Sequence, residues 1–461
     1  MTKTREYSAS DGILNMLYAL QNGADTGSGI RPMRDYGKNL LGSKLPPAFI
    51  QRAVSNLNNL FGNYPVTSDY APSVLFTVIF IVLGTAHFTL FTVNVSRGHL
   101  FYISFAWGLI AWLKGVGFAL RSQWALDILQ VNIGLASEVI LIVSGVFLST
   151  VNLVLAQRLF TWRHPVGGDR KLFKNIMYGM YVMVVAVIVG TVFAQASPYV
   201  NFVGPVAFQR YGKAVKGTSI LIISYSLTAI SLVLMSYFFK PTRKDENLYT
   251  YQPWWVESFH PFYFVKKNAS REAEETFMKR NHNHRHAVRV IAATHHHFNM
   301  VEGLSNERGD LTHNYSIIIV TITTAFTFVE SILRCITCFQ MQPSWNNSPL
   351  CKPIVAYICW GVLETLAHIF YLVGRVDLRF YKPDILPVKI RSIITAEQSF
   401  FASRNISQNV SDEEESEAED MDDFSYTESP PSRTAAPPGY EFKNDKLEES
   451  TSNDNESDFN F

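Results

Sequence analysis

VLFTVIFIVL, the stretch at residues 74–83, contains no charged side chain and no polar stripe at a helical repeat. The run VMVVAVIV at residues 182–189 has the same character. A helix of this kind has no polar face to turn toward water. About 20 such residues cross the hydrocarbon core of a bilayer, because a helix satisfies its own backbone N–H and C=O groups there. Both runs therefore predict transmembrane helices.

Stretches of the same character and of spanning length recur along the chain. There are seven, at residues 74–94, 100–120, 128–156, 175–196, 217–239, 314–336 and 353–374. Buried helices of a large water-soluble protein are the alternative, but so many stretches of spanning length argue against it. We therefore expect an all-α, polytopic membrane protein with seven transmembrane helices.

Charge separates a membrane body from an acidic tail. The whole chain has a formal net charge of +1, but residues 400–461 hold 4 Lys and Arg against 17 Asp and Glu, which is −13. Residues 1–399 therefore carry +14, and this segregation predicts a disordered, solvated tail. The expected parts are an N-terminal tail (1–73), a seven-helix domain (74–374) with a large loop (240–312), a juxtamembrane segment (375–399) and the acidic tail (400–461).

The positions of Lys and Arg predict the orientation, because cytoplasmic connections retain positive charge. The third connection and the segment after the last helix carry Arg158, Arg163, Arg170, Lys171, Lys174, Arg375, Arg379 and Lys382. The second and sixth connections offer little beyond Arg121 and Lys352. The fourth connection does not fit this pattern, because it carries three basic residues, Arg210, Lys213 and Lys216. On balance we expect a luminal or exterior N-terminus and a cytosolic C-terminus.

The four cysteines all lie between residues 335 and 359. Cys338 and Cys351 bracket the sixth connection, which the charge argument places on the non-cytosolic side. In an oxidising compartment a disulfide between them would clamp this connection. The alternative is two small apolar side chains at helix ends.

The large fifth connection begins with a cluster of aromatic residues, and it holds seven of the twelve histidines, including His295, His296 and His297. Such a density of histidine is compatible with zinc or copper binding or with a pH switch. No ligand spacing singles out a site, so solvated loop polarity is the preferred interpretation. We expect no metal, no cofactor and no nucleic-acid partner.

Ionisable residues inside the predicted helices are the main candidates for function. They are Lys114, Glu138, Glu330, Arg334, Glu364 and His368, with His87 and Asn132 as further polar groups. Each unpaired charge in hydrocarbon costs about 2.5 to 3.5 kcal/mol on insertion scales. The spacing allows local pairs between Glu330 and Arg334 and between Glu364 and His368. Lys114 and Glu138 lie in sequential helices that can also meet. Structural pairing and a pathway for protons, ions or lipid headgroups explain these residues equally well.

Catalysis inside the membrane is the least favoured class. Seven-helix zinc hydrolases place histidines four residues apart on facing helices. The last helix offers Glu364 and His368 but no second histidine at that interval, and no other helix supplies a Ser-x-x-x-His pair. We expect the protein not to be an enzyme.

The acidic tail carries the motif Pro437-Pro438-Gly439-Tyr440, which matches the PPxY pattern. The prolines favour a polyproline II turn that docks on a WW domain, and the tyrosine fills an adjacent pocket. A chance match is the alternative. The motif predicts recruitment of a WW-domain ubiquitin ligase and sorting to the vacuole.

Ser411 and Ser416 lie in an acidic run, and each has an acidic residue three positions later. This pattern resembles the sites of acidophilic kinases. Phosphates there would keep the tail away from an anionic membrane. A purely solvating acidic run is the alternative, and both interpretations can hold together.

Several short segments carry a family resemblance. They are RGHLF at 97–101, NLVLAQRLF at 152–160 with His164-Pro165 after it, Tyr211-Gly212, Glu364 and GRVDLRF at 374–380. Over about residues 74–383 the chain resembles a fungal family of seven-helix membrane proteins of unknown function. The resemblance implies seven helices and brings no activity. In topology alone the chain is similar to fungal lipid-translocating exporters.

Three functions stay open from the sequence. The preferred one is transport or translocation of a lipid or small molecule along Lys114, Glu138 and Glu364. The alternatives are a receptor-like sensor and a membrane adaptor that acts through its tail. We expect the vacuolar membrane, with the plasma membrane as the alternative.

Overall fold

The computed structural model describes residues 6–21, 23–239, 250–253, 256, 258–269, 288–290, 314–381 and 384–385. Within these residues, seven helices are long and apolar enough to cross a membrane. The described chain is otherwise made of short helices, loops and three short strands. The predicted all-α class with seven spanning helices is therefore confirmed.

The spanning helices follow the predicted stretches and extend past most of them. They are α4 (Tyr70–Ser96, preceded by η1, Thr67–Asp69), α5 (Tyr102–Leu126), α6 (Val131–Arg163), α8 (Lys171–Val200), α9 (Pro205–Phe238), α12 (Asn314–Gln340) and a last span of three parts. The last span consists of α13 (Pro353–Ala356), the π-helical η5 (Tyr357–Leu363) and α14 (Glu364–Val373). The added residues include basic side chains such as Arg163, Lys171 and Lys213, because helices continue beyond the hydrocarbon where water or protein surrounds them.

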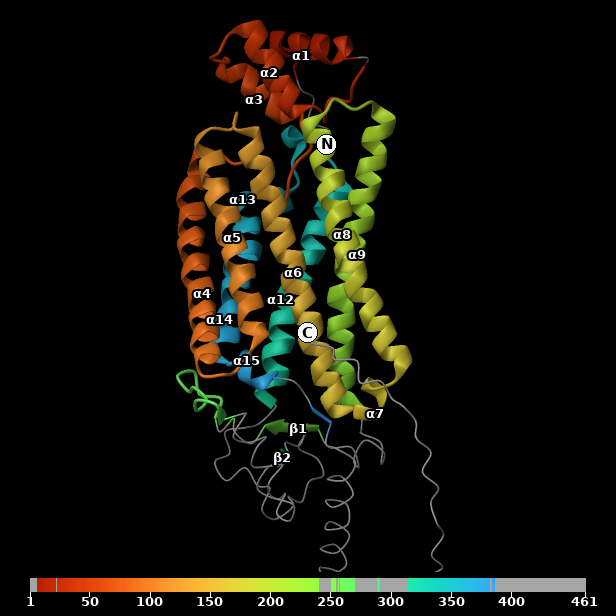
Figure 1. Cartoon of the computed structure of the whole chain (residues 1–461). Helices are drawn as coiled ribbons and strands as arrows, with labels where there is room; N and C mark the ends of the chain where they lie inside the picture. The colour runs from red at the N-terminus through yellow and green to blue at the C-terminus, as the bar shows by residue number, and fades with distance from the viewer. Residues whose placement is uncertain are drawn as a thin grey trace, which may run out of the picture. The chain divides into compact units, whose positions relative to one another are not determined.

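The bundle is arranged around α6, which packs against α5, α8, α9 and α12 (Figure 1). α4 packs along α5, and α14 contacts α4 and α12. The apolar side chains on the outer faces of α4 and α8 are exposed, among them Leu75, Val78, Val82, Val185 and Val189. Exposed apolar side chains at this density are expected where lipid is the solvent.

Small residues let α4 and α5 approach closely. A Cβ atom at Gly84 would lie 2.1 Å from Cδ1 of Trp112 and 3.1 Å from the carbonyl oxygen of Gly108. Glycine is therefore required for the observed separation of the two backbones. Close backbone approach through small residues is the usual way in which helices gain packing energy inside a bilayer.

Three further helices cover one end of the bundle, where the sequence predicts only a tail. They are α1 (Ala9–Leu20), α2 (Ile30–Leu41) and α3 (Pro47–Asn56), which share a small core containing Leu14, Leu17, Met33 and Phe49. Arg52 forms an ion pair with Asp11 and holds the pKa of that carboxyl well below its usual range. We call this unit the N-terminal cap.

The N-terminal cap is attached to the bundle by hydrogen bonds and aromatic contacts. The Ser28 hydroxyl donates to the Val203 carbonyl at 3.2 Å, and the phenol groups of Tyr64 and Tyr199 lie 3.0 Å apart. The ring of Phe202 stacks on Tyr36 of α2. These contacts place residues 57–64 directly over the ends of α6 and α8.

The opposite end of the bundle carries short elements of the third and fifth connections and of the segment after the last helix (Figure 1). They are α7 (Pro165–Gly168), α15 (Val376–Arg379) and the strands β1 (Thr250–Pro253), β2 (Val288–Val290) and β3 (Asp384–Ile385). The strands form an antiparallel sheet in the order β2-β1-β3, in which Tyr251 pairs with Val290 and with Asp384. The sixth connection, at the N-terminal-cap end, holds η3 (Ser344–Asn346) and η4 (Pro349–Cys351).

Two of the segments that carry the family resemblance meet at this end. Arg375, which has a positive φ of 46°, donates two hydrogen bonds to Asp377, at 3.0 and 2.9 Å. Asp377 also accepts from the Asn94 amide at 3.2 Å, and Arg97 donates to the Val265 carbonyl at 3.1 Å. These contacts tie α4, α15 and part of the fifth connection into one unit.

Candidate functional site

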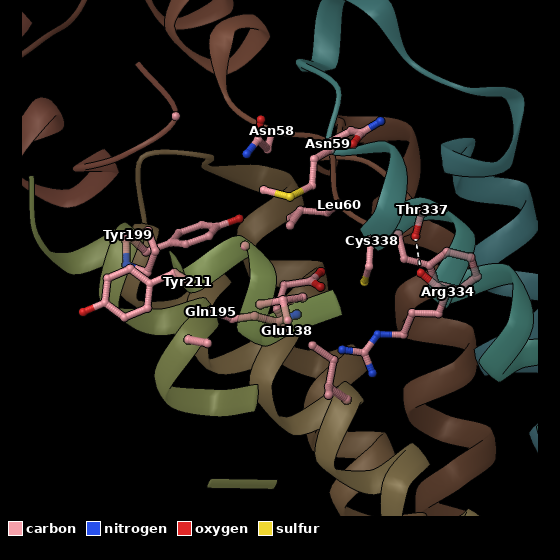
Figure 2. A pocket seen from close by; sticks show the side chains of 18 of the residues that line it. Asn58, Asn59, Leu60, Glu138, Gln195, Tyr199, Tyr211, Arg334, Thr337 and Cys338 are labelled. Atoms are coloured by element: carbon pink, nitrogen blue, oxygen red, sulfur yellow. Dashed lines mark hydrogen bonds between the residues drawn. The ribbon is translucent and has the colours of Figure 1, made fainter. Parts of the chain in front are cut away.

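A cavity of about 140 Å³ lies between α6, α8, α9 and α12, beneath residues 58–64 (Figure 2). Six aromatic side chains line it, namely Phe61, Tyr64, Tyr199, Phe208, Tyr211 and Trp360. Glu138 and Arg334 are the two charged side chains that line it. A partly enclosed apolar cavity with a few polar groups is the usual form of a small-molecule site.

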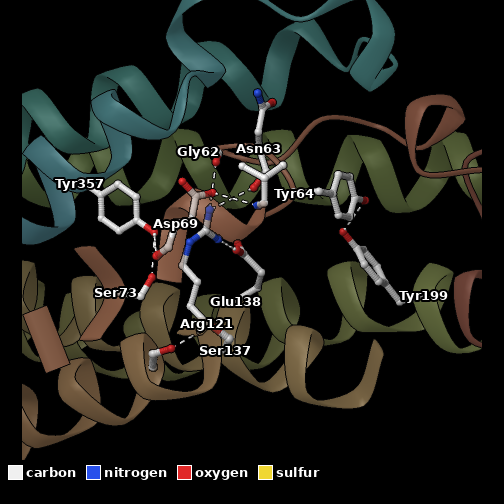
Figure 3. Close-up of polar contacts among 12 residues, drawn as sticks. Gly62, Asn63, Tyr64, Asp69, Ser73, Arg121, Ser137, Glu138, Tyr199 and Tyr357 are labelled. Carbon is white, nitrogen blue, oxygen red and sulfur yellow. Dashed lines mark hydrogen bonds and ion pairs between the residues drawn. The ribbon is translucent and has the colours of Figure 1, made fainter. Parts of the chain in front are cut away.

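Arg121 and Glu138 form the first buried ion pair beside this cavity (Figure 3). Arg121 Nη1 donates to Glu138 Oε1 at 2.9 Å, and Nη2 donates to the carbonyls of Gly62 and Asn63 at 2.9 and 3.1 Å. Arg121 is thereby bonded to both the neighbouring helix and the loop over the cavity. The prediction that Arg121 lies in the second connection is wrong, because α5 continues to Leu126 and buries it.

Lys114 and Glu364 form the second ion pair, deeper in the bundle. Their Nζ and Oε1 atoms are 2.5 Å apart, and Lys114 Nζ also donates to the Leu141 carbonyl at 3.3 Å. The ring of Trp360 lies 5.5 Å from the same Nζ. The expected contact of Lys114 with Glu138 is not formed. Lys114 is two helical turns from Arg121, about 10 Å along α5, and Glu138 lies at the height of Arg121.

Glu330 lies beside Glu364, and a glycine of α6 makes room for both. A Cβ atom at Gly145 would lie 3.1 Å from Glu330 Oε1 and 3.9 Å from Glu364 Oε1. The charges of Lys114 and Arg334 both act on Glu330. The expected local ion pair between Glu330 and Arg334 is absent from the described part of the chain. Glu330 turns instead toward Glu364 and the Trp360 side chain.

His368 contacts His87 and not Glu364, although the spacing on α14 allows a pair with Glu364. Its Nδ1 lies 3.3 Å from Nε2 of His87 on α4, and both side chains are buried. One turn further along α14, the Tyr371 hydroxyl donates to Asn152 Oδ1 at 2.6 Å, and its ring stacks on Trp107 at 3.9 Å. Buried polar groups therefore continue past the ion pairs toward the end of the bundle opposite the N-terminal cap.

The predicted disulfide between Cys338 and Cys351 is not formed, and all four cysteines are free thiols. Cys338 lines the cavity. Cys351 accepts a hydrogen bond from the Asn59 amide at 3.2 Å, and burial raises the pKa of its thiol. The loop that the disulfide was expected to clamp is held by this hydrogen bond and by the backbone contact of Asn59 with Gln342 at 2.9 Å.

Several predicted sites lie outside the described residues. They are the tail motif at Pro437, Pro438 and Tyr440, the serines Ser411 and Ser416, and the histidine-rich part of the fifth connection. Among the residues that the structure does describe, no group of three or more His, Cys, Asp or Glu side chains is arranged to hold a metal ion.

The fold and these buried charges define a multi-pass α-helical membrane protein. The model of a family described as "Protein of unknown function (DUF3112)" matches residues 165–381, from α7 through α15. No curated protein and no solved structure matches the chain. The match lies inside the region where the sequence resembles a family of unknown function, and the description of the matching family names no activity.

The Lys114–Glu364 pair gives a direct test of the site. Lys114→Met leaves the Glu364 carboxylate buried without its cation, and we expect a loss of about 3 to 5 kcal/mol in the free energy of unfolding. Replacing both residues, by Lys114→Met and Glu364→Leu, should restore most of the lost free energy of unfolding. Thermal unfolding in detergent or nanodiscs measures both effects.

The matched control is Lys174→Met, which breaks an ion pair with Asp169 in which both side chains are more than half exposed. A surface pair of this kind contributes less than about 1 kcal/mol. A Lys114→Met protein as stable as the Lys174→Met protein would contradict the pairing.

Proposed function

We propose that the protein binds a small amphipathic molecule in the cavity and moves it across the membrane. The observation that carries this proposal is the continuity between the cavity and the buried charges. Glu138 and Arg334 stand at the cavity wall, and the charged groups continue through Glu330 to Glu364 and Lys114 in the middle of the bundle. We propose transport in preference to catalysis.

Helix packing alone does not require these charges. Six charged side chains between the ends of α5, α6, α12 and α14 are at most 9% exposed: Lys114, Arg121, Glu138, Glu330, Arg334 and Glu364. A buried ion pair can often be replaced by apolar residues without loss of stability, so it is weak evidence for a structural role. Charges held inside a membrane bundle are more often associated with ion, proton or substrate pathways.

Trp360 connects the cavity to the deeper ion pair. Its side chain lines the cavity and lies over Lys114, and it is four residues before Glu364. The intervening backbone is the π-helical η5, and π-helical segments are frequent at functional sites. A molecule pressing on Trp360 would therefore act on the Lys114–Glu364 contact between α5 and α14. Breaking and re-forming this contact is the conformational step that we propose for transport.

The proposed orientation places the N-terminal cap and the cavity on the luminal or exterior side. It is supported by the basic residues at the opposite end of the bundle, among them Arg163, Lys171 and Arg379. Positive charge of this kind favours the cytosolic side. We propose the vacuolar membrane as the location, with the plasma membrane as the alternative.

Reconstituted flux tests the transport proposal. The purified protein in proteoliposomes should accelerate the movement of short-chain fluorescent phospholipids or of radiolabelled small organic acids. Glu364→Gln keeps the shape of the side chain but removes its charge, and we expect at least a tenfold lower rate, or about 1.4 kcal/mol in the barrier. Lys174→Met should leave the rate unchanged. No flux of either kind above protein-free liposomes, or equal rates for parent and Glu364→Gln, would contradict transport.

We also propose that the tail recruits a WW-domain ubiquitin ligase through Pro437, Pro438 and Tyr440, with phosphorylation of Ser411 and Ser416 keeping the tail accessible. The support is the motif itself, in an acidic segment rich in Ser and Pro. Tyr440→Ala removes the side chain that fills the pocket beside the WW groove. We expect loss of ubiquitin conjugation and a shift of a fluorescently tagged copy between membranes, whereas Tyr426→Ala in the same tail should change neither. Unchanged conjugation and location in Tyr440→Ala would contradict this role.

A further inference from the structure

We infer that the cavity is a binding site for a small organic anion. Its anionic group would be held by Arg334, and its ring or short carbon chain would lie against the aromatic wall. This inference rests on the proposed function for the identity of the site, and it specifies the chemical class of the molecule.

Arg334 is a buried cation for whose side-chain donors the described residues supply no hydrogen-bond acceptor. It is 9% exposed, and it lines both the 140 Å³ cavity and a neighbouring space of about 10 Å³. A guanidinium group keeps its charge at all physiological pH values and presents five N–H donors. Within the described residues, no hydrogen bond or ion pair is formed by this side chain. A buried charge left this way is costly unless a partner reaches it.

The two carboxylates nearest to Arg334 interact with it through charge, but among the described residues neither forms a hydrogen bond or ion pair with it. Glu138 accepts from Arg121 at 2.9 Å, and Arg121 cancels its charge from the side away from the cavity. Glu330 lies beside Glu364, close to Gly145. The positive charge that the cavity presents is therefore that of Arg334. A carboxylate can accept two parallel hydrogen bonds from a guanidinium, which is the strongest neutralising contact available to it.

The cavity volume limits the size of the apolar part. A cavity of about 150 Å³ lined by apolar side chains binds benzene, and the volume here is about 140 Å³. Rings of Tyr199, Phe208 and Trp360 supply apolar contact on several sides. A benzene ring or a chain of about six carbons fits, which favours a water-soluble acid over a whole lipid. The 10 Å³ space beside Glu330 is close to the volume of one water probe.

Three other molecules could occupy the cavity, and the experiment distinguishes them from an organic anion. Water alone could hydrate Arg334. A cation could use Glu138 and the aromatic rings. The anionic headgroup of a membrane lipid could supply the same chemistry from the bilayer.

The experiment uses the full chain in nanodiscs of phosphatidylcholine and three probes of one shape: benzoate, benzyl alcohol and benzylamine. Binding is read from the unfolding temperature and from tryptophan fluorescence, because Trp360 lines the site. We expect benzoate to bind most tightly. Arg334→Gln should weaken benzoate binding at least about tenfold, as expected for lost hydrogen bonds to a charged group. Arg334→Lys should keep part of the affinity for benzoate, and Lys174→Met should bind benzoate as tightly as the parent does.

Absence of benzoate binding, or equal binding of benzyl alcohol, would overturn the inference, and so would tighter binding of benzylamine. Equal benzoate binding by parent and by a folded Arg334→Gln protein would also overturn it. Competition between benzoate and phosphatidylserine added to the nanodiscs would support the anion site and identify the membrane as the source. Arg334-dependent binding without flux in proteoliposomes would support the anion site and contradict the transport proposal. Flux of fluorescent phospholipids without benzoate binding would support transport and contradict the anion site.

Discussion

Charge buried in a bundle that faces lipid is the constraint on which the rest of the structure depends. Lys114 and Arg121 lie where water cannot neutralise them, so their counter-charges come from neighbouring helices. The pair between Lys114 and Glu364 connects α5 to α14, and the pair between Arg121 and Glu138 connects α5 to α6. The geometry of the bundle and the position of the cavity both follow from where these contacts are made.

The backbone is adapted to these contacts at particular residues. Gly145 leaves room on α6 for two carboxyl groups, where any larger residue would displace Glu330. The π-helical η5 changes the rotation of the last span between Trp360 and Glu364, so that one side chain reaches the cavity and the other reaches Lys114. The loop that follows the N-terminal cap completes the site from above, because its Gly62 and Asn63 carbonyls accept hydrogen bonds from Arg121.

The sequence predicts the helices and most of the buried charges, since length, hydropathy and the cost of a charge in lipid are local properties. It does not predict the partners, because a helical repeat gives the face of a residue but not the helix that lies opposite. The spacing allows Glu364 to pair with His368, whereas in the structure Lys114 contacts Glu364 from another helix. Arg121 was missed because hydropathy falls before α5 ends, although it lies two turns from Lys114 on the same face. The cap helices were missed because they are short and amphipathic, and the cavity because its wall combines residues from distant parts of the chain.

A structure of the full chain in a lipid nanodisc, at a resolution that shows side chains, tests the central claim most directly. We expect Lys114 and Glu364 to be in contact at a depth where acyl chains surround the outer faces of α4 and α8. Separated side chains exposed to a water-filled channel, or an outer face of α4 covered by water or protein, would contradict it.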